Sequence, residues 1–331
     1  MKKILIVKLA AIGDVVMSLT MLTAIKEQYG NCSITWVCGE MVVPILQQFA
    51  IENIITVNEH KLLTGNFATK VWEILKLWRK LIFHNYDIVI TAHGDKRYRL
   101  LTWPVLAGER NGFGLINGEK IPYPGCYHGD EYARLITEQK RSEARHYAPP
   151  IFANSENIGT LSDSYFVILA PGGAKNVMRD DACRRWPIAS YVALAQELLK
   201  SGYTVAVTGA ISDRWIQPYF AGMQIKDYVG KTDLLSMLNL FRRAGVVVTH
   251  DSGPMHLAIL SGTKVVALFG PTAPSEKVPV SNKVKVLWKN ASLDCCPCYD
   301  GKNYAVCKNN LCMQRIRVAD VLTAIHEFEQ D

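Results

Sequence analysis

The sequence predicts an α/β protein of two similar domains, each with a parallel β-sheet covered by helices. Short apolar runs alternate with helical patterns along the first half of the chain. The polar segment 141–163, with Pro149 and Pro150, has no periodicity and is typical of a linker. The alternation then restarts, because "YFVILAPGGAK" from residue 165 echoes "KILIVKLAAIGD" from residue 3. We therefore expect one domain at 1–155 and another at 156–331.

The first domain is predicted to be a doubly wound sheet. Apolar runs typical of strands buried on both faces lie at 3–7, 33–38, 53–57 and 86–94. Apolar residues at helical spacing predict helices at 15–30, 41–49 and 70–84. Because short crossovers join parallel strands through helices, this order favours a parallel sheet.

The second domain shows the same pattern. After the strand that begins at 165, strands are predicted at 204–209, 246–250 and 264–270. Helices are predicted at 186–203, 233–245, 252–262 and 318–330. Ligands of parallel sheets bind beyond the carboxyl ends of the strands, so we expect the loops after residues 7 and 170 to face a central cleft.

Composition excludes several classes of protein. The chain has 331 residues, 49% of them hydrophobic and 20% charged, which is enough for two cores. It lacks a run of about 18 uncharged apolar residues, and Lys8 and Asp14 interrupt the apolar start, so we expect neither a membrane span nor a signal peptide. The net charge of +7 is spread over both halves, which fits an anionic ligand or a membrane surface rather than nucleic acid.

The segment "THDSGPMHLAILSGTKVVALFGPT" (249–272) carries the strongest local signal for a ligand. A strand ends at residue 250, and a turn of Asp251, Ser252 and Gly253 leads into a helix that holds His256. The free N–H groups of a helix N-terminus bind anions such as pyrophosphate. A plain β-α-β unit with Asp251 as helix cap is the alternative.

The segment "APGGAKNVMRDDACRRWP" (170–187) follows another strand end. It combines Gly172 and Gly173 with the cations Lys175, Arg179, Arg184 and Arg185. Fixed cations stabilise the negative charge that develops on a leaving nucleotide. A solvated basic loop is the alternative interpretation.

Asp14 lies where the first strand gives way to a helix. Its carboxylate is either a helix cap or a catalytic base at the mouth of the cleft. A dinucleotide-dependent oxidoreductase is disfavoured, because "AAIGDV" (10–15) and "APGGAK" (170–175) lack the G-x-G-x-x-G pattern.

Five of the nine cysteines lie between residues 295 and 312. Cys295 and Cys298 form one pair, and Cys307 and Cys312 form a second. Four thiolates at such spacing can form a tetrahedral structural site for zinc or iron, whereas a set of reduced thiols is the alternative.

The chain resembles glycosyltransferase family 9, the ADP-heptose:lipopolysaccharide heptosyltransferases. The matching segments include "ILIVKLAAIGDVVMSL", "YDIVITAHGDKRYRLL", "RNGFG", "RRWPIASYVALAQEL" and "DSGPMHLAILSGTKVVALFGPTAP". The resemblance implies a GT-B fold of two Rossmann-like domains and an inverting mechanism. It also implies a nucleotide-sugar donor on the C-terminal domain, an acceptor on the N-terminal domain and no cofactor for catalysis.

Residue by residue, the resemblance makes Asp14 the catalytic base. Arg184 stands where the family usually has a lysine for the donor phosphates, which keeps the charge on a wider, planar group. The loop "TGAISDR" (208–214) resembles the segment that meets the nucleoside, with Asp213 for the ribose. The implied donor-binding residues are Gly172, Gly173, Lys175, Arg184, Gly209, Asp213, Asp251, Ser252, Gly253 and His256.

The acceptor of this family is the anionic inner core of lipopolysaccharide, which implies a basic surface on the N-terminal domain. Candidate residues are Lys61, Lys96, Arg97 and Arg99. The helix at 72–83 mixes tryptophans with cations and either rests on the membrane surface or packs on the sheet as an ordinary amphipathic helix. We expect a cytoplasmic enzyme at the periphery of the inner membrane. The alternatives are a family 9 transferase that uses another nucleotide sugar or a protein acceptor, and a non-catalytic protein that binds a sugar nucleotide.

Overall fold

The computed structural model describes residues 1–331 except 144, 153–162, 176–178, 291–292, 301–302 and 331. The chain forms two compact units, Met1–Pro150 (unit 1) and Ile151–Asp331 (unit 2). The expected boundary at 155–156 lies outside the described residues.

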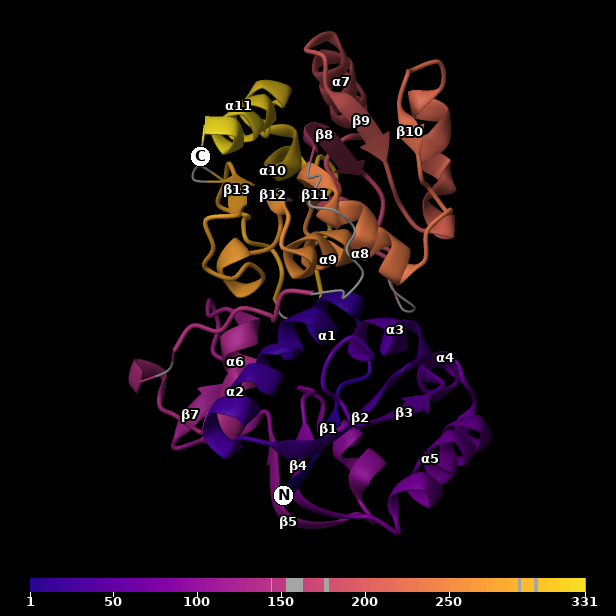
Figure 1. Cartoon of the computed structure of the whole chain (residues 1–331), viewed down its shortest axis with the longest axis vertical. Helices are drawn as coiled ribbons and strands as arrows, with labels where there is room; N and C mark the ends of the chain where they lie inside the picture. Colours follow the sequence, from indigo (N-terminus) through magenta and orange to yellow (C-terminus); the bar gives the residue numbers. More distant parts are fainter. Residues whose placement is uncertain (144, 153–162, 176–178, 291–292, 301–302, 331) are drawn as a thin grey trace. The chain divides into compact units, whose positions relative to one another are not determined.

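Unit 1 is built on a five-stranded parallel sheet in the order β3-β2-β1-β4-β5 (Figure 1). The strands are β1 (Lys2–Val7), β2 (Cys32–Gly39), β3 (Asn53–Val57), β4 (Asn85–Thr91) and β5 (Leu106–Gly112). A small antiparallel hairpin, β6 (Gly114–Ile116) and β7 (Glu119–Ile121), follows β5. The apolar runs predicted as buried strands are buried, since the side chains of β1 from Ile4 to Val7 are fully covered.

The helices of unit 1 cover both faces of this sheet. They are α1 (Ile12–Ser18), α2 (Thr20–Tyr29), α3 (Val43–Leu46), α4 (Glu59–Thr64), α5 (Phe67–Leu81) and α6 (His128–Thr137), with a 3-10 helix η2 (Lys96–Thr102) after β4. α6 packs on α1 and α2, whereas α5 packs on α4, β3 and η2 (Figure 1). The predicted helix 15–30 is two helices and begins earlier, which places Asp14 inside the first turn of α1.

Unit 2 is built on a six-stranded parallel sheet in the order β10-β9-β8-β11-β12-β13. The strands are β8 (Asp163–Ala170), β9 (Thr204–Val207), β10 (Lys226–Asp227), β11 (Ala244–His250), β12 (Lys264–Phe269) and β13 (Val284–Trp288). The helices are α7 (Ile188–Lys200), α8 (Leu234–Arg242), α9 (Gly253–Ser261), α10 (Leu311–Gln314) and α11 (Val318–Gln330), with 3-10 helices at Ala182–Arg184 (η4) and Ile211–Phe220 (η5). The α/β class with parallel sheets is confirmed.

The strand orders define where each unit can hold a ligand. In unit 1 the chain runs from β1 outward to β3 and then returns to β4 on the other side of β1. In unit 2 it runs from β8 to β10 and returns to β11 beside β8. Ligands of open parallel sheets bind at such switch points, beyond the carboxyl ends of the strands. The loops after β1, β4, β8 and β11 are therefore the places to look for a site.

Among the helices that the structure describes, none combines the length and the apolar character that crossing a bilayer requires.

Candidate active site

In unit 2, Asp213 joins the loops that follow β8 and β9. Its buried carboxylate accepts hydrogen bonds from Gly173 N (3.0 Å) and Ala210 N (2.8 Å). A Cβ on Gly172 would lie 2.3 Å from Asp213 Cγ, and one on Gly209 would lie 2.9 Å from Asp213 Cβ. The two glycines therefore make room for this carboxylate. The structure gives Asp213 a role in positioning the loops, and its ribose contact stays a prediction.

The loop after β8 also lies against the N-terminus of α9. Gly173 has a φ of +82°, and a Cβ there would lie 3.3 Å from Ser252 Cβ. Ser252 is the N-cap residue, but its hydroxyl donates to His250 O (3.0 Å) and does not cap the helix. In the first turn of α9, Pro254 has no N–H and Met255 N donates to Ser252 O at 3.1 Å. The N–H of Gly253, where the helix begins, is therefore the group of this turn that suits an anion.

Arg184 and Asp251 form a largely buried ion pair beside this helix start. Arg184 Nη1 lies 3.5 Å from Asp251 Oδ2 and donates to Tyr304 Oη at 3.3 Å. Thr272 Oγ1 donates to Asp251 Oδ2 at 2.6 Å. Burial alone would raise the pKa of Asp251, but Arg184 and Thr272 outweigh it, so that pKa lies below its ordinary value. The N-cap residue of α9 is Ser252 and not Asp251, so the interpretation of Asp251 as the helix cap is wrong.

Arg184 also keeps an unused hydrogen-bond donor. Its Nε is buried and has no hydrogen-bond partner among the residues that the structure describes. Burial would lower the pKa of the guanidinium, but Asp251 and Tyr304 raise it above its ordinary value, so the cation is permanent. A buried donor on a permanent cation is a group that a phosphate oxygen would satisfy.

The remaining residues predicted for the donor take different positions. His256 is buried on α9 and close enough to Asp251 to lower its pKa. Lys175 is exposed and pairs through its backbone with Asp180. Arg185 donates to Gly173 O from Nε (3.0 Å) and Nη2 (2.9 Å), so it holds the glycine loop in place. The loops of unit 2 thus bring most of the predicted donor residues to one switch point.

His250, at the end of β11, is a buried group that sequence reasoning did not assign. Its Nδ1 lies 3.2 Å from Tyr191 Oη, and burial together with Arg184 lowers its pKa from 6.5 to about 3. An unfolded histidine takes up a proton below its ordinary pKa, whereas the folded one does not. We therefore expect the free energy of unfolding to fall by a few kcal/mol, on the order of one per pH unit, as the pH decreases from about 6.5 toward 3.

The variant His250→Gln tests this expectation, since glutamine does not titrate and still offers Tyr191 a hydrogen-bond partner. Urea unfolding followed by circular dichroism across this pH range should show a much flatter dependence in the variant. An equally steep dependence in both proteins would show that His250 does not carry the effect.

In unit 1, Asp14 is held by a buried lysine. Ala11 is the N-cap of α1, so Asp14 lies in the first helical turn and the cap interpretation is wrong. Its Oδ2 lies 3.2 Å from Lys8 Nζ, and its side chain is 40% exposed whereas that of Lys8 is 4% exposed. The buried Lys8 therefore holds the Asp14 carboxylate in place, and the exposed part of that carboxylate can contact a ligand.

Other titratable groups surround Lys8. Its Nζ lies 5.4 Å from the ring centre of Tyr132, and burial raises the pKa of that phenol to about 12. His93 Nε2 accepts from Leu9 N (3.0 Å), and burial and Lys8 lower the pKa of this histidine, which keeps it neutral. Burial raises the pKa of Glu59. Sequence reasoning missed this cluster, because its members come from four separate segments of the chain.

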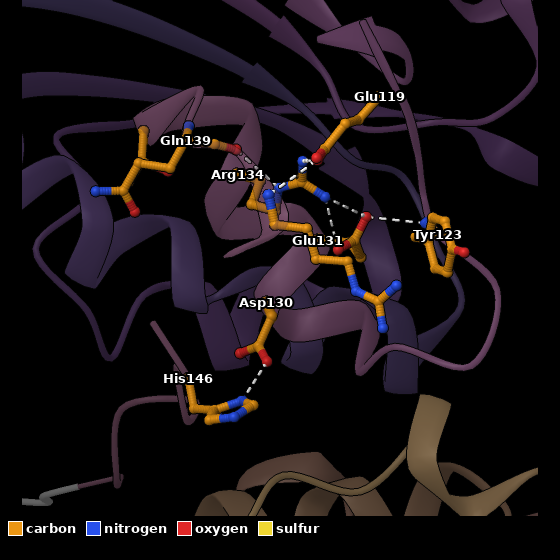
Figure 2. Close-up of polar contacts among 9 residues, drawn as sticks. Glu119, Tyr123, Asp130, Glu131, Arg134, Gln139 and His146 are labelled. Atoms are coloured by element: carbon orange, nitrogen blue, oxygen red, sulfur yellow. Dashed lines mark hydrogen bonds and ion pairs between the residues drawn. The ribbon is translucent and has the colours of Figure 1, made fainter. Parts of the chain in front are cut away.

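Figure 2 shows the contacts that fix α6, the helix that carries Tyr132. The fully buried guanidinium of Arg134 pairs with Glu131 (3.2 Å) and Glu119, and its Nε donates to Gln139 O (3.1 Å). Glu131 also accepts from Tyr123 N at 2.9 Å. These bonds tie α6 to the β6-β7 hairpin and so hold Tyr132 in position beside Lys8.

The residues predicted for the acceptor are not gathered in one place. Lys61 lines a cavity of about 610 Å³ with Lys76 and Lys80, whereas Arg99 lines a cavity of about 390 Å³ with Arg110. Lys96 is exposed, and Arg97 pairs with Asp95. The basic character predicted for unit 1 is thus present at two separate cavities.

The predicted metal site is not supported. Cys295, Cys298, Cys307 and Cys312 all lie in the part of the chain that the structure describes, and there it has no group of three or more Cys, His, Asp or Glu side chains able to hold a metal ion. Cys312 belongs to the core of unit 2, beneath Gly270, whereas Cys295 and Cys307 are exposed.

Comparison with solved structures defines the class of protein. A glycosyl transferase family 9 protein from Veillonella parvula superposes with a TM-score of 0.76 at 19% identity, over 99% of this chain and 97% of the other. The ADP-heptose lps heptosyltransferase II of E. coli superposes with a TM-score of 0.74 at 20% identity, over 99% and 98% of the two chains. The fold is therefore the GT-B fold of glycosyltransferases, as predicted.

Sequence comparison then identifies the family. The profile described as glycosyltransferase family 9 (heptosyltransferase) matches residues 131–307. Lipooligosaccharide heptosyltransferase 2 of Haemophilus influenzae is 25% identical over 317 residues, which cover 86% of this chain and 88% of that protein. The chain belongs to glycosyltransferase family 9 and is a glycosyl-transferring enzyme.

Proposed function

We propose that the chain transfers a heptose from ADP-heptose to a hydroxyl of the lipopolysaccharide inner core, with inversion at the anomeric carbon. The observation that carries the proposal is the spare buried donor of Arg184 beside the N-terminus of α9. The names of its relatives support the substrates, because the similar E. coli protein is an ADP-heptose lps heptosyltransferase and the Haemophilus protein acts on lipooligosaccharide.

Unit 2 (the domain predicted from residue 156) holds the donor in this proposal. Arg184 and the N–H of Gly253 bind the diphosphate, and the exposed Lys175 adds positive charge. These groups are held in place by Asp251, Tyr304 and neighbouring loops. They therefore stabilise the negative charge on the departing ADP at little cost of reorganisation. Asp213 contacts the ribose at the edge of the same loops.

Unit 1 (predicted as residues 1–155) supplies the base and binds the acceptor. Asp14 accepts the proton of the acceptor hydroxyl while that oxygen attacks the anomeric carbon from the face opposite the diphosphate. One C–O bond forms as the bond to the diphosphate breaks, and the proton stays on Asp14. Lys8 is a positioning residue, since its ammonium orients the carboxylate at 3.2 Å.

The basic residues of unit 1 bind the acceptor. Lipopolysaccharide inner core carries carboxylates and phosphates, which Lys61, Lys96, Arg97 and Arg99 complement in charge. The acceptor is anchored in a membrane through its lipid part. We therefore place the enzyme at the cytoplasmic face of the inner membrane, in peripheral contact with it.

A transfer assay tests the proposal. Purified enzyme is incubated with ADP-heptose and a panel of truncated lipopolysaccharides, and the products are analysed by mass spectrometry. We expect one panel member to gain the mass of one heptose. Transfer only from another nucleotide sugar would contradict the proposed donor, and transfer only to a protein would contradict the proposed acceptor. Binding of ADP-heptose without any turnover would contradict the proposed enzymatic activity.

A further inference from the structure

The outer surface of α5 and the neighbouring η2 exposes large apolar side chains. Besides Phe67 at the first position of α5, these include Val71, Trp72, Leu75 and Ile82 on α5 and at its C-cap, and Leu100 and Trp103 on and just after η2. Trp72 is 60% exposed and Trp103 is 70% exposed. Such residues are ordinary when scattered singly on a surface, but a continuous group of them marks an interaction site. We call the six residues Val71, Trp72, Leu75, Ile82, Leu100 and Trp103 the α5–η2 face.

The six residues form one surface because the two helices are fastened together. Trp78 Nε1 donates to Leu100 O at 2.9 Å, and the Trp78 and Trp103 ring centres lie 5.6 Å apart. α5 buries Leu77 and Leu81 toward the core, whereas Leu75 lies on the opposite side of the helix. Packing of α5 on the sheet therefore explains its inner row of apolar residues and leaves the outer row exposed in the described part of unit 1.

The exposed charges of α5 that border this face have one sign. Lys76, Arg79 and Lys80 are exposed along the polar edge of α5, and Lys76 Nζ lies 5.6 Å from the ring centre of Trp72. Glu73 is the one carboxylate of α5, all of which the structure describes, and it is buried and paired with Lys76 at 3.1 Å. The exposed part of α5 therefore presents cations beside tryptophan and aliphatic residues.

This combination favours an anionic lipid surface over a second copy of the chain. A two-fold contact through the face would bring the cations of both copies into one interface, where they repel. At a membrane surface, in contrast, apolar side chains enter the boundary between headgroups and acyl chains while lysine and arginine reach the lipid phosphates. Tryptophan is also enriched at this boundary.

We propose that the α5–η2 face docks unit 1 on a bilayer that contains anionic phospholipid. This inference extends the proposed function and rests on it for one assumption, namely that the acceptor is linked to a lipid in the membrane. The element η2 carries Trp103 at its C-cap and the candidate acceptor residues Lys96, Arg97 and Arg99 along its length. Docking through this element holds the acceptor-binding cations close to the membrane that contains the acceptor.

Vesicle flotation tests the inference without any transfer activity. The full chain is mixed with vesicles of phosphatidylethanolamine and phosphatidylglycerol, or of phosphatidylcholine alone. We expect the wild type to float with the anionic vesicles and to be released by salt. Trp72→Glu/Leu75→Glu should lower this binding by roughly tenfold or more, since it places two charges in the apolar contact.

A matched control adds the same charge elsewhere. Val280 and Val306 are exposed residues of unit 2, and Val280→Glu/Val306→Glu should bind the anionic vesicles as the wild type does. Circular dichroism melting checks that both variants are folded. Equal binding of the wild type to both kinds of vesicle, or undiminished binding of Trp72→Glu/Leu75→Glu, would overturn the inference. So would a wild-type dimer in light scattering that this variant dissociates.

Activity on a deacylated, soluble acceptor separates this inference from the proposed function. Trp72→Glu/Leu75→Glu should transfer to that acceptor at the wild-type rate and lose transfer only to acceptor embedded in vesicles. A wild type that binds anionic vesicles but transfers to no acceptor would contradict the proposed function and leave the docking surface intact.

Discussion

Replacing Asp14 by asparagine should lower kcat by roughly 10²–10⁴-fold, the range that general-base catalysis contributes. Asparagine has the shape of aspartate but cannot take the proton of the acceptor hydroxyl. Its side chain also lacks the negative charge that pairs with the Lys8 ammonium, which lies 3.2 Å from Asp14 Oδ2 in the wild type. Because Asp14 belongs to unit 1 and the proposed diphosphate site to unit 2, the Kd for ADP should stay near the wild-type value. Transfer is measured by mass spectrometry and ADP binding by calorimetry.

Glu59→Gln is the matched control for this prediction. Glu59 is a second carboxylate near Lys8, and burial raises its pKa. Its replacement removes a carboxylate from the same cluster and should leave most of the turnover. Full activity in Asp14→Asn together with a large loss in Glu59→Gln would assign the base to Glu59 and contradict the proposed mechanism.

Replacing Arg184 by glutamine should weaken ADP binding by on the order of 100-fold, since it removes a charge-assisted contact to the diphosphate. The same change leaves the buried Asp251 without its cation, so we expect a loss of about 3 kcal/mol in the free energy of unfolding. Calorimetry measures the first effect and urea unfolding the second.

The double variant Arg184→Gln/Asp251→Asn separates the two effects. It removes both charges of the pair and should recover most of the stability, because no unpaired charge stays buried. Binding of ADP should stay weak in the double variant. Recovery of ADP binding along with stability would show that Arg184 acts by holding the structure and not by contacting the phosphates.

The strands of both sheet centres were predictable because each is a short apolar run that the sheet buries on both faces. β3 has the predicted bounds, Asn53–Val57, and β11 and β12 differ from prediction by one or two residues. The edge strand β5 was missed, since its sequence "LAGERNG" is mostly exposed and polar. α6 was missed for the opposite reason, because it buries charged residues that a sequence pattern assigns to the surface.

The candidate site was predictable where a motif marks the end of a strand, as at Asp14 and Asp251. The sequence does not show which residues contact this site. Lys8 contacts Asp14 only because the turn before α1 brings the two side chains together. Tyr304 contacts Arg184, the partner of Asp251, although 120 residues separate the two in the sequence. The cysteine spacing predicted a metal site that the structure does not support. Spacing alone did not show that the core of unit 2 takes up Cys312.

The central claim is a single displacement at the anomeric carbon in which Asp14 takes the proton of the acceptor hydroxyl. The anomeric configuration of the product tests this claim most directly. The one-bond carbon–hydrogen coupling at the transferred heptose, measured by NMR, distinguishes the two anomers. We predict the configuration opposite to that of the ADP-heptose donor. A product with the donor's configuration would contradict a direct attack by the acceptor hydroxyl and, with it, the role of Asp14.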